Sequence, residues 1–133
     1  MSATVLVIED NENNAYLVTF ILEQYGYRVI QARDGETGIA LARKLRPDLI
    51  LVDIQLPGMD GYAVAHELVK NEESRCIPIV AVTSYAMMGD RERILEAGCI
   101  GYIEKPINPT TFMAEIEQFL PVHPEGTGST KAL

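Results

Sequence analysis

The sequence predicts an α/β fold of the doubly wound type, in which a parallel sheet carries helices on both faces. Two observations support this class. Five short apolar runs alternate with five longer segments whose apolar residues recur at helical spacing. Three of the runs are continuous and rich in β-branched residues, which is typical of parallel strands covered on both faces. A (βα)5 order with right-handed crossovers gives a three-layer sandwich.

Composition limits the class of protein further. The chain has 133 residues, enough for one domain with its own core. Its 19 acidic and 11 basic residues give a net charge of −8, which argues against nucleic-acid binding because phosphate backbones select for clustered Lys and Arg. No apolar run reaches the roughly 18 residues of a membrane helix, and no secretory signal is visible. Two cysteines, Cys76 and Cys99, fit no disulfide framework or metal spacing. We therefore expect a cytoplasmic domain.

The strands are predicted from short apolar runs. In chain order they cover residues 5–8, 27–30, 49–52, 79–82 and 102–103. The first, third and fourth runs are wholly apolar, whereas the second includes Arg28 and the fifth is limited to Tyr102 and Ile103. All five are short enough for single strands of a compact sheet.

The helices are predicted from apolar periodicity, at about residues 12–25, 35–46, 62–72, 87–97 and 109–120. Gly26 and Gly98 are natural stops, Asp34 can cap the second helix before Pro47 ends it, and Pro109 suits the first turn of the fifth. The residues expected to face inward are, helix by helix, Val18, Ile21, Leu22 and Tyr25; Gly38, Leu41, Ala42 and Leu45; Ala65, Leu68 and Val69; Ile94 and Leu95; and Phe112, Ile116, Phe119 and Leu120. Residues 121–133 lack periodicity and predict a disordered tail after a domain over 1–120.

Polar side chains follow four of the five strands. Ligands of open parallel α/β sheets bind at the carboxyl ends of the strands, so these side chains should converge on one site. Clustered carboxylates raise the pKa of at least one member unless a cation joins them, and oxygen ligands without His or Cys favour Mg²⁺. The converging residues are Glu9, Asp10, Asp53, Thr83, Ser84 and Lys105.

These groups are suited to phosphoryl transfer. A carboxylate can attack phosphorus and form an aspartyl phosphate. The Lys105 ammonium suits a phosphoryl group, and the Thr83 hydroxyl can donate to a second phosphoryl oxygen. Phosphoryl transfer depends mainly on positioning and on charge neutralisation, and this set supplies both.

Four segments, in order and each at a strand end, resemble the receiver domain of two-component response regulators over about residues 4–120. They are VLVIEDN (5–11), PDLILVDIQLPGMDG (47–61), VTS (82–84) and YIEKP (102–106). Each alone is a weak match, but together they are specific. The resemblance implies a flavodoxin-like fold with strand order 2-1-3-4-5. It also implies a signalling switch that catalyses only its own phosphorylation and dephosphorylation.

The resemblance implies a metal and phosphoacceptor centre. Asp53 is the expected phosphoacceptor. Mg²⁺ would be bound by Asp10, by Asp53 and by the main-chain carbonyl of Gln55, with Glu9 acting through water. The side chains of Gln55 and Tyr85 flank the path of the attacking water and are expected to tune the lifetime of the phosphoryl group.

The resemblance also implies a switch. Thr83 and Lys105 would contact the phosphoryl group, and the small Ser84 leaves room for it. Tyr102 is the expected aromatic switch, which turns inward when Thr83 moves toward the phosphate. The Lys105–Pro106 peptide bond is expected to be cis.

The implied partners are a phosphodonor, either a sensor histidine kinase or a histidine phosphotransfer protein, and a downstream protein. The first helix has Leu17 and Phe20 outside its inward stripe. They either pack against a neighbouring helix or, with Pro106, dock the donor. The face made by the fourth helix, the fifth strand and the fifth helix is expected to switch on phosphorylation. We expect a monomer, with dimerisation on phosphorylation left open.

Residues 86–99, with Tyr102, are similar to stand-alone receivers of the DivK cell-division type. A receiver fragment of a hybrid kinase or of a longer regulator is an alternative. A phosphatase of the haloacid-dehalogenase type also uses a strand-end Asp with Mg²⁺, but its general acid lies two residues later, where Gln55 cannot protonate a leaving group. A flavodoxin-like cofactor binder would need a phosphate-cradling loop where Glu9 and Asp10 instead repel phosphate.

Overall fold

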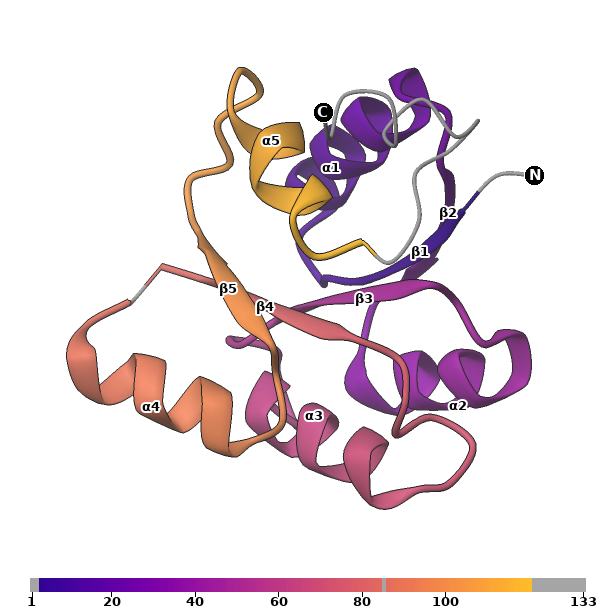
Figure 1. The fold of residues 1–133 in the computed structure, drawn as a ribbon, viewed down its shortest axis with the longest axis vertical. Helices are drawn as coiled ribbons and strands as arrows, with labels where there is room; N and C mark the ends of the chain where they lie inside the picture. Colours follow the sequence, from indigo (N-terminus) through magenta and orange to yellow (C-terminus); the bar gives the residue numbers. More distant parts are fainter. Residues whose placement is uncertain (1–2, 85, 121–133) are drawn as a thin grey trace.

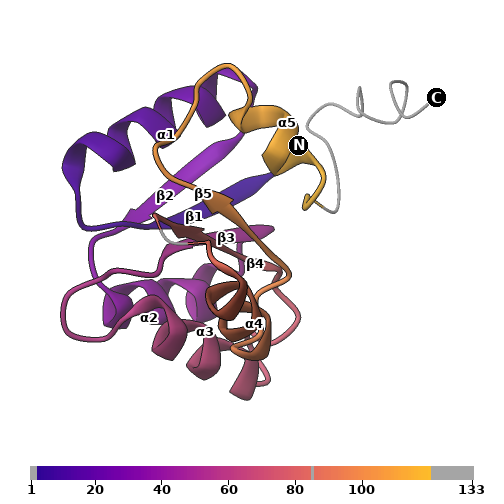
Figure 2. The same cartoon turned by 90° about the vertical axis from the view of Figure 1, so that its left-hand side faces the viewer.

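The computed structural model describes residues 3–84 and 86–120 and contains one parallel sheet with the strand order β2-β1-β3-β4-β5. Helices α1 and α5 cover one face of the sheet, and α2, α3 and α4 cover the other (Figures 1 and 2). The predicted doubly wound (βα)5 architecture and its strand order are therefore confirmed. None of the helices within the described ranges is long and apolar enough to span a membrane.

The elements alternate strictly along the chain. The strands are β1 (Thr4–Ile8), β2 (Arg28–Ala32), β3 (Leu49–Asp53), β4 (Ile79–Thr83) and β5 (Gly101–Glu104). The helices are α1 (Glu12–Gln24), α2 (Gly35–Leu45), α3 (Gly61–Lys70), α4 (Met88–Glu96) and α5 (Phe112–Glu117). Every strand matches a predicted run to within one or two residues at each end.

The sheet separates two hydrophobic cores. Along β1, Val5 and Val7 pack into the core beneath α1 and α5, whereas Leu6 and Ile8 pack into the core beneath α2, α3 and α4. Successive strand residues point to opposite faces, so a strand covered on both faces must be apolar at every position. This requirement explains the continuous apolar runs in the sequence.

Side-chain caps fix where three of the helices begin. The side chains of Asn11, Asp34 and Asp60 accept hydrogen bonds of 2.8–2.9 Å from backbone N–H groups three residues later. Such caps satisfy donors that the first helical turn leaves unpaired. Asn11 and Asp60 thereby define the loops that follow β1 and β3, the two strands whose ends carry the predicted acidic residues.

Three residues predicted to face inward are instead exposed. Tyr25 is 56% exposed, because it caps α1 with non-helical backbone angles and no longer follows the helical spacing. Leu45, the last residue of α2, is 46% exposed. Leu95 is 58% exposed because its neighbour Ile94 occupies the buried position, and one residue turns a helix by about 100°.

The fifth helix begins later than predicted. The backbone N–H groups of Thr111 and Phe112 both donate to the carbonyl of Asn108, and the Asn108 side chain accepts from Thr110 N–H. Pro109 therefore lies in a turn, and α5 starts at Phe112. Phe119 lies beyond the end of α5 and is half-buried.

Gly61, the first residue of α3, approaches the end of β3. Its N–H donates to the Ile54 carbonyl at 2.9 Å, and a Cβ would lie 2.6 Å from both the Asp53 carbonyl oxygen and the Ile54 Cα. Gly61→Ala should therefore lower the free energy of unfolding in urea by about 1–3 kcal/mol, as overpacking does. The control is Gly89→Ala in α4, where a Cβ meets nothing within 4 Å. It should gain about 0.5–1 kcal/mol, and equal losses in the two variants would contradict the argument.

Candidate functional site

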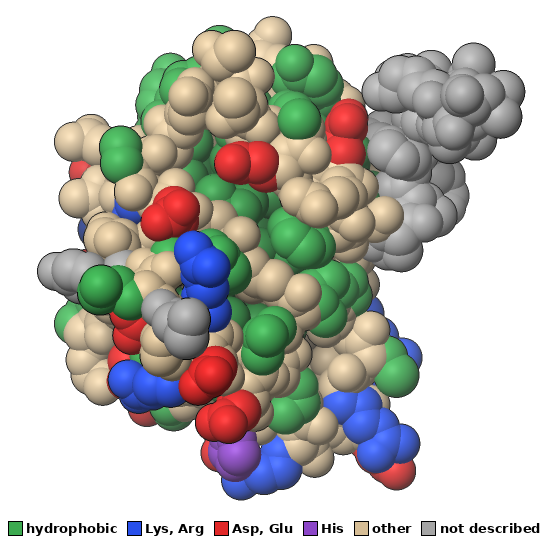
Figure 3. Space-filling view, turned by 60° about the vertical axis from the view of Figure 1, so that its left-hand side comes forward, with side chains coloured by type: hydrophobic (Ala, Val, Ile, Leu, Met, Phe, Trp, Pro, Cys, Tyr) green, Lys and Arg blue, Asp and Glu red, His purple; other side chains and the backbone are tan. Residues whose placement is uncertain are grey.

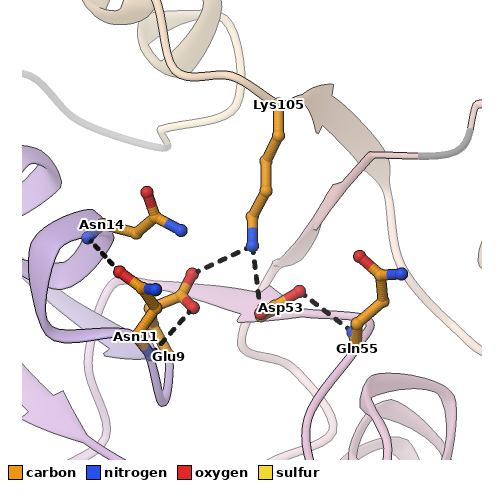
Figure 4. Close-up of polar contacts among 6 residues, drawn as sticks. All are labelled: Glu9, Asn11, Asn14, Asp53, Gln55 and Lys105. Carbon is orange, nitrogen blue, oxygen red and sulfur yellow. Dashed lines mark hydrogen bonds and ion pairs between the residues drawn. The ribbon is translucent and has the colours of Figure 1, made fainter.

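The carboxyl ends of β1, β3 and β5 bring Glu9, Asp53 and Lys105 together (Figure 4). The Lys105 Nζ lies 3.0 Å from Asp53 Oδ2 and 3.4 Å from Glu9 Oε1. Asp53 is 3% and Glu9 7% exposed, so the lysine is shared by two buried carboxylates. The predicted convergence of distant residues at this sheet edge is found.

Backbone donors orient both carboxylates. The N–H of Gln55 donates to Asp53 Oδ1 at 2.9 Å, and the N–H of Asn11 donates to Glu9 Oε2 at 3.2 Å. Lys105 contacts the second oxygen of Asp53, so both oxygens of that side chain have a donor. Hydrogen-bond donors on both oxygens fix the orientation of the Asp53 carboxylate at the carboxyl end of β3.

An acidic cluster surrounds this pair. Glu9, Asp10 and Asp53 each offer a carboxylate oxygen, and these oxygens lie within 4.8 Å of one another. Lys105 offsets one of the three negative charges. A site of hard oxygen donors with residual negative charge fits a hard divalent cation, which takes carboxylate and carbonyl ligands.

The pKa of Glu9 is raised from its ordinary value of 4.5 to about 7. Burial is the main cause, followed by the charge of Asp53 and a hydrogen bond to it. The Lys105 ammonium and the Asn11 N–H act in the opposite direction but do not cancel these effects. The direction of the shift agrees with the prediction for clustered carboxylates, but burial contributes more to it than the charge of Asp53.

This shift gives a pH dependence of stability. Because the pKa of Glu9 is higher in the folded protein, its stabilising contribution is complete below pH 4.5 and is lost as the pH rises through about 7. Between pH 5 and pH 8, the metal-free protein should lose on the order of 2 kcal/mol in its free energy of unfolding. Urea denaturation in a chelator measures this. Glu9→Gln should flatten the profile, and an unchanged profile in that variant would count against this cause.

Of the predicted switch residues, Thr83 is joined to Lys105 of the site, whereas Tyr102 lies further back along β5. Thr83 ends β4 and is 2% exposed, and its carbonyl accepts the Lys105 N–H at 2.8 Å. Ser84 follows and is exposed. Tyr102 is half-buried in β5 and pairs with Ala81 of β4.

The remaining predicted residues lie at the rim. The Lys105–Pro106 bond is cis, as predicted, and Pro106 is exposed. The Gln55 side chain is exposed, whereas Tyr85 lies outside the described residues.

The outer face of α1 presents an aromatic pair. Phe20 is 50% and Tyr16 70% exposed, and their rings stack with centroids 6.3 Å apart. Leu17 is half-buried and packs against the core shared with α5, so part of its role is structural. Tyr16 was missed in the sequence, although its i, i+4 spacing to Phe20 is a signal that could have identified the pair.

Comparison with known proteins identifies a matching family and similar relatives. Residues 5–117 match the model of the response regulator receiver domain. The polar-differentiation response regulator DivK of Brucella anthropi is 46% identical over 120 residues, which cover 90% of this chain and 98% of that protein. DivK of Brucella ovis is similar to the same extent. The family and the DivK type predicted from the motifs agree with these matches.

Solved structures are similar in fold. The chemotaxis protein CheY4 of Vibrio cholerae superimposes with a TM-score of 0.86 at 28% identity, over 90% of this chain and all of that one. The receiver domain of the sensor histidine kinase PA1611 from Pseudomonas aeruginosa superimposes with a TM-score of 0.81 at 34% identity, over 90% of this chain and 98% of that one. That structure has a magnesium ion coordinated in its active-site cleft.

Proposed function

The chain belongs to the response regulator receiver domain family, and on this premise we propose that Asp53 accepts a phosphoryl group from a phosphohistidine. One observation carries the assignment to this residue. Asp53 is a buried carboxylate at the end of β3, oriented by the Gln55 N–H and by the Lys105 ammonium and flanked by two further acids. We propose that the donor is a sensor histidine kinase or a histidine phosphotransfer protein.

We propose Mg²⁺ as the metal of this site. The carboxylates of Glu9, Asp10 and Asp53 and the main-chain carbonyl of Gln55 would hold it, with Glu9 acting through water. When bound, the ion supplies positive charge against the phosphoryl oxygens and the clustered carboxylates. The donor chemistry of the cluster and the magnesium in the related PA1611 receiver support this choice.

The residues of the chain then perform the transfer. An Asp53 oxygen forms the new bond to phosphorus as the bond from phosphorus to the donor imidazole nitrogen breaks; the imidazole leaves with the electron pair and takes up a proton from solvent. Lys105 and the Thr83 hydroxyl donate to phosphoryl oxygens, and Ser84 leaves space for them. Hydrolysis by water later restores the Asp53 carboxylate and releases phosphate. Gln55, with Tyr85, tunes the rate of that step.

Incubation with acetyl phosphate tests the assignment, because a small donor needs no protein docking. We expect a mass increase of one phosphoryl group that requires Mg²⁺ and maps to the peptide containing Asp53. Intact mass spectrometry with and without a chelator, followed by peptide mapping, makes the measurement. No adduct in the presence of Mg²⁺, or an adduct on another peptide, would overturn the proposal.

We propose that the donor docks on the exposed face of α1, with Phe20 and Leu17 in contact and Pro106 at the edge of the interface. Exposed aromatic residues are frequent anchors of protein interfaces. Phe20→Ala should slow phosphotransfer from a protein donor by about tenfold, the effect of losing roughly 1.4 kcal/mol, while the rate with acetyl phosphate stays unchanged.

Two comparisons sharpen this docking test. Tyr25→Ala removes an exposed aromatic at the far end of α1 and should leave both rates unchanged. Leu17→Ala is expected to slow the protein donor with some loss of stability, since Leu17 also packs against the core. Equal slowing of both donors by Phe20→Ala would show that the effect is not docking.

We further propose that phosphorylation changes the face made by α4, β5 and α5, and that this face contacts a downstream protein in the cytoplasm. The net charge of −8 supports a protein target rather than nucleic acid. On this proposal the domain acts catalytically only on its own phosphoryl group. The position of Gln55, two residues after Asp53, supports a switch over a phosphatase because its amide cannot protonate a leaving group.

A further inference from the structure

Among the α4 residues whose side chains the structure describes, few make hydrophobic contact with the rest of the domain. Of the α4 residues whose side chains the structure describes, Ile94 is the buried one. Acidic and basic side chains are interspersed with hydrophobic ones on this side of the molecule (Figure 3). With Ile94 as the buried anchor among these described residues, the position of α4 depends on the contacts at its margins.

Two arginine–tyrosine contacts lie at the margins of α4. The guanidinium carbon of Arg93 lies 4.1 Å from the ring centroid of Tyr62 in α3. The guanidinium carbon of Arg91 lies 5.5 Å from the ring centroid of Tyr102 in β5. Both separations are within the range of cation–π attraction. Arg93 therefore joins α4 to a neighbouring helix, whereas Arg91 joins it to the predicted switch residue.

Arg91 makes a second contact that Arg93 lacks among the contacts described. Its Nε donates to the carbonyl of Ala86 at 2.9 Å. Ala86 follows Thr83 by three residues in the sequence and precedes α4, so one guanidinium joins the Ala86 carbonyl to the Tyr102 ring. Thr83 and Tyr102 are the residues expected to respond to the phosphoryl group, and Arg91 touches one of them and the chain that follows the other.

We propose that Arg91 is a positioning residue for the phosphorylation of Asp53: it holds Tyr102 and Ala86 in their unphosphorylated arrangement. The proposal rests on the proposed function, because it requires Tyr102 to turn inward when Asp53 is phosphorylated. A contact made in one of two states shifts their equilibrium toward that state by its own free energy. Phosphorylation must break the Arg91 contact, so the free energy of that contact opposes phosphorylation.

The expected effect follows from the strength of one exposed cation–π contact, which corresponds to about a two- to fivefold change in an equilibrium constant. Arg91→Ala should bind beryllofluoride, a phosphoryl mimic, two- to fivefold more tightly than the parent protein in saturating Mg²⁺. Arg91→Lys keeps a cation that can lie over the ring and should bind close to the parent value. Arg93→Ala is the matched control, because it removes the contact to Tyr62 and should leave the affinity unchanged.

A double-mutant cycle tests whether Arg91 acts through the ring. In a Tyr102→Leu background, Arg91→Ala should produce no further change in affinity, since the partner of the guanidinium is already absent. Amide hydrogen exchange gives a second readout. Arg91→Ala alone, without beryllofluoride, should speed exchange over residues 86–97, and urea denaturation checks that each variant remains folded.

The outcomes separate the two proposals. If the parent protein binds beryllofluoride and Arg91→Ala binds it no more tightly, the role of Arg91 is overturned and the function of Asp53 stands. An equal gain in Arg93→Ala also overturns it, because the effect is then a general loosening of α4. If the parent protein fails to bind beryllofluoride in Mg²⁺, the proposed function fails, and the role of Arg91 with it.

Discussion

Asparagine in place of Asp53 is expected to abolish phosphoryl incorporation and, at the same time, to stabilise the metal-free protein. The substitution removes the carboxylate that we propose as the nucleophile but keeps its shape and an oxygen for the Gln55 N–H. It also removes one of three clustered negative charges, while Lys105 keeps its contact with Glu9. Relief of like-charge repulsion should raise the free energy of unfolding by on the order of 1 kcal/mol.

Two measurements on the same variant check this expectation. Intact mass after acetyl phosphate treatment reports the adduct, and urea denaturation with and without Mg²⁺ reports stability. Mg²⁺ should stabilise the parent protein more than Asp53→Asn, because the variant retains fewer ligands. The control is Asp48→Asn, which removes a carboxylate that accepts the Thr4 N–H near the opposite end of β3. It should keep full incorporation, and an adduct that persists in Asp53→Asn would rule out the assigned phosphoacceptor.

Loss of the Lys105 ammonium should have the largest effect on the stability of the metal-free protein. Lys105→Met leaves two buried carboxylates without their cation, and breaking such a pair costs about 3–5 kcal/mol. The loss should be largest near pH 8 and smaller at pH 5, where Glu9, with its pKa of about 7, takes up a proton. Mg²⁺ should restore much of the stability, because a divalent cation replaces the lost charge.

The rate of phosphorylation of this variant, unlike its stability, should not be restored by Mg²⁺. Lys105→Met should slow incorporation from acetyl phosphate even in saturating Mg²⁺, since the ammonium that is proposed to contact the phosphoryl group is gone. Lys70→Met is the matched control, because Lys70 pairs with Glu67 at the surface, where such pairs contribute about 0–1 kcal/mol. Equal destabilisation by the two substitutions would contradict the argument that burial makes the Lys105 ion pairs contribute more to stability than a surface pair.

The fold and the convergence of the charged residues could be predicted because both follow from assigning the apolar runs to parallel strands. Once residues 5–8, 49–52 and 102–103 are assigned to parallel strands, Glu9, Asp53 and Lys105 must lie at the same sheet edge. No side-chain detail is needed for that step. The conclusion therefore holds even though individual strands begin or end one or two residues from their predicted limits.

The ends of the helices could not be predicted in the same way. Periodicity identifies the face of a helix that packs on the sheet, but it does not show where the helix leaves the packed layer. Tyr25 and Leu45 continue the apolar spacing of their helices and are nevertheless exposed. At the start of α5, the Asn108 side chain and carbonyl form a turn that competes with the helix-favouring position of Pro109.

Contacts between side chains on separate elements could not be predicted from the sequence either. The Arg91–Tyr102 contact joins residues of α4 and β5, and no spacing rule connects residues that are adjacent only after the layers pack. The Gln55 N–H that orients Asp53 is a backbone group, so its role does not depend on the side chain that a sequence displays. Such features depend on rotamers and loop paths, which are settled by the assembled structure.

The two-sided covering of the sheet has a consequence for how a signal passes from one protein to another. The aromatic pair Tyr16 and Phe20 belongs to α1, whereas Arg91 belongs to α4 on the opposite face of the sheet (Figure 2). On the proposed function, a donor seated on α1 would leave α4 uncovered, but α5, which belongs to the proposed downstream face, lies on the same side of the sheet as α1. A downstream protein that contacts only the α4 part of this face could therefore bind while the donor is present, whereas one that needs α5 would have to approach the side of the sheet that the donor occupies.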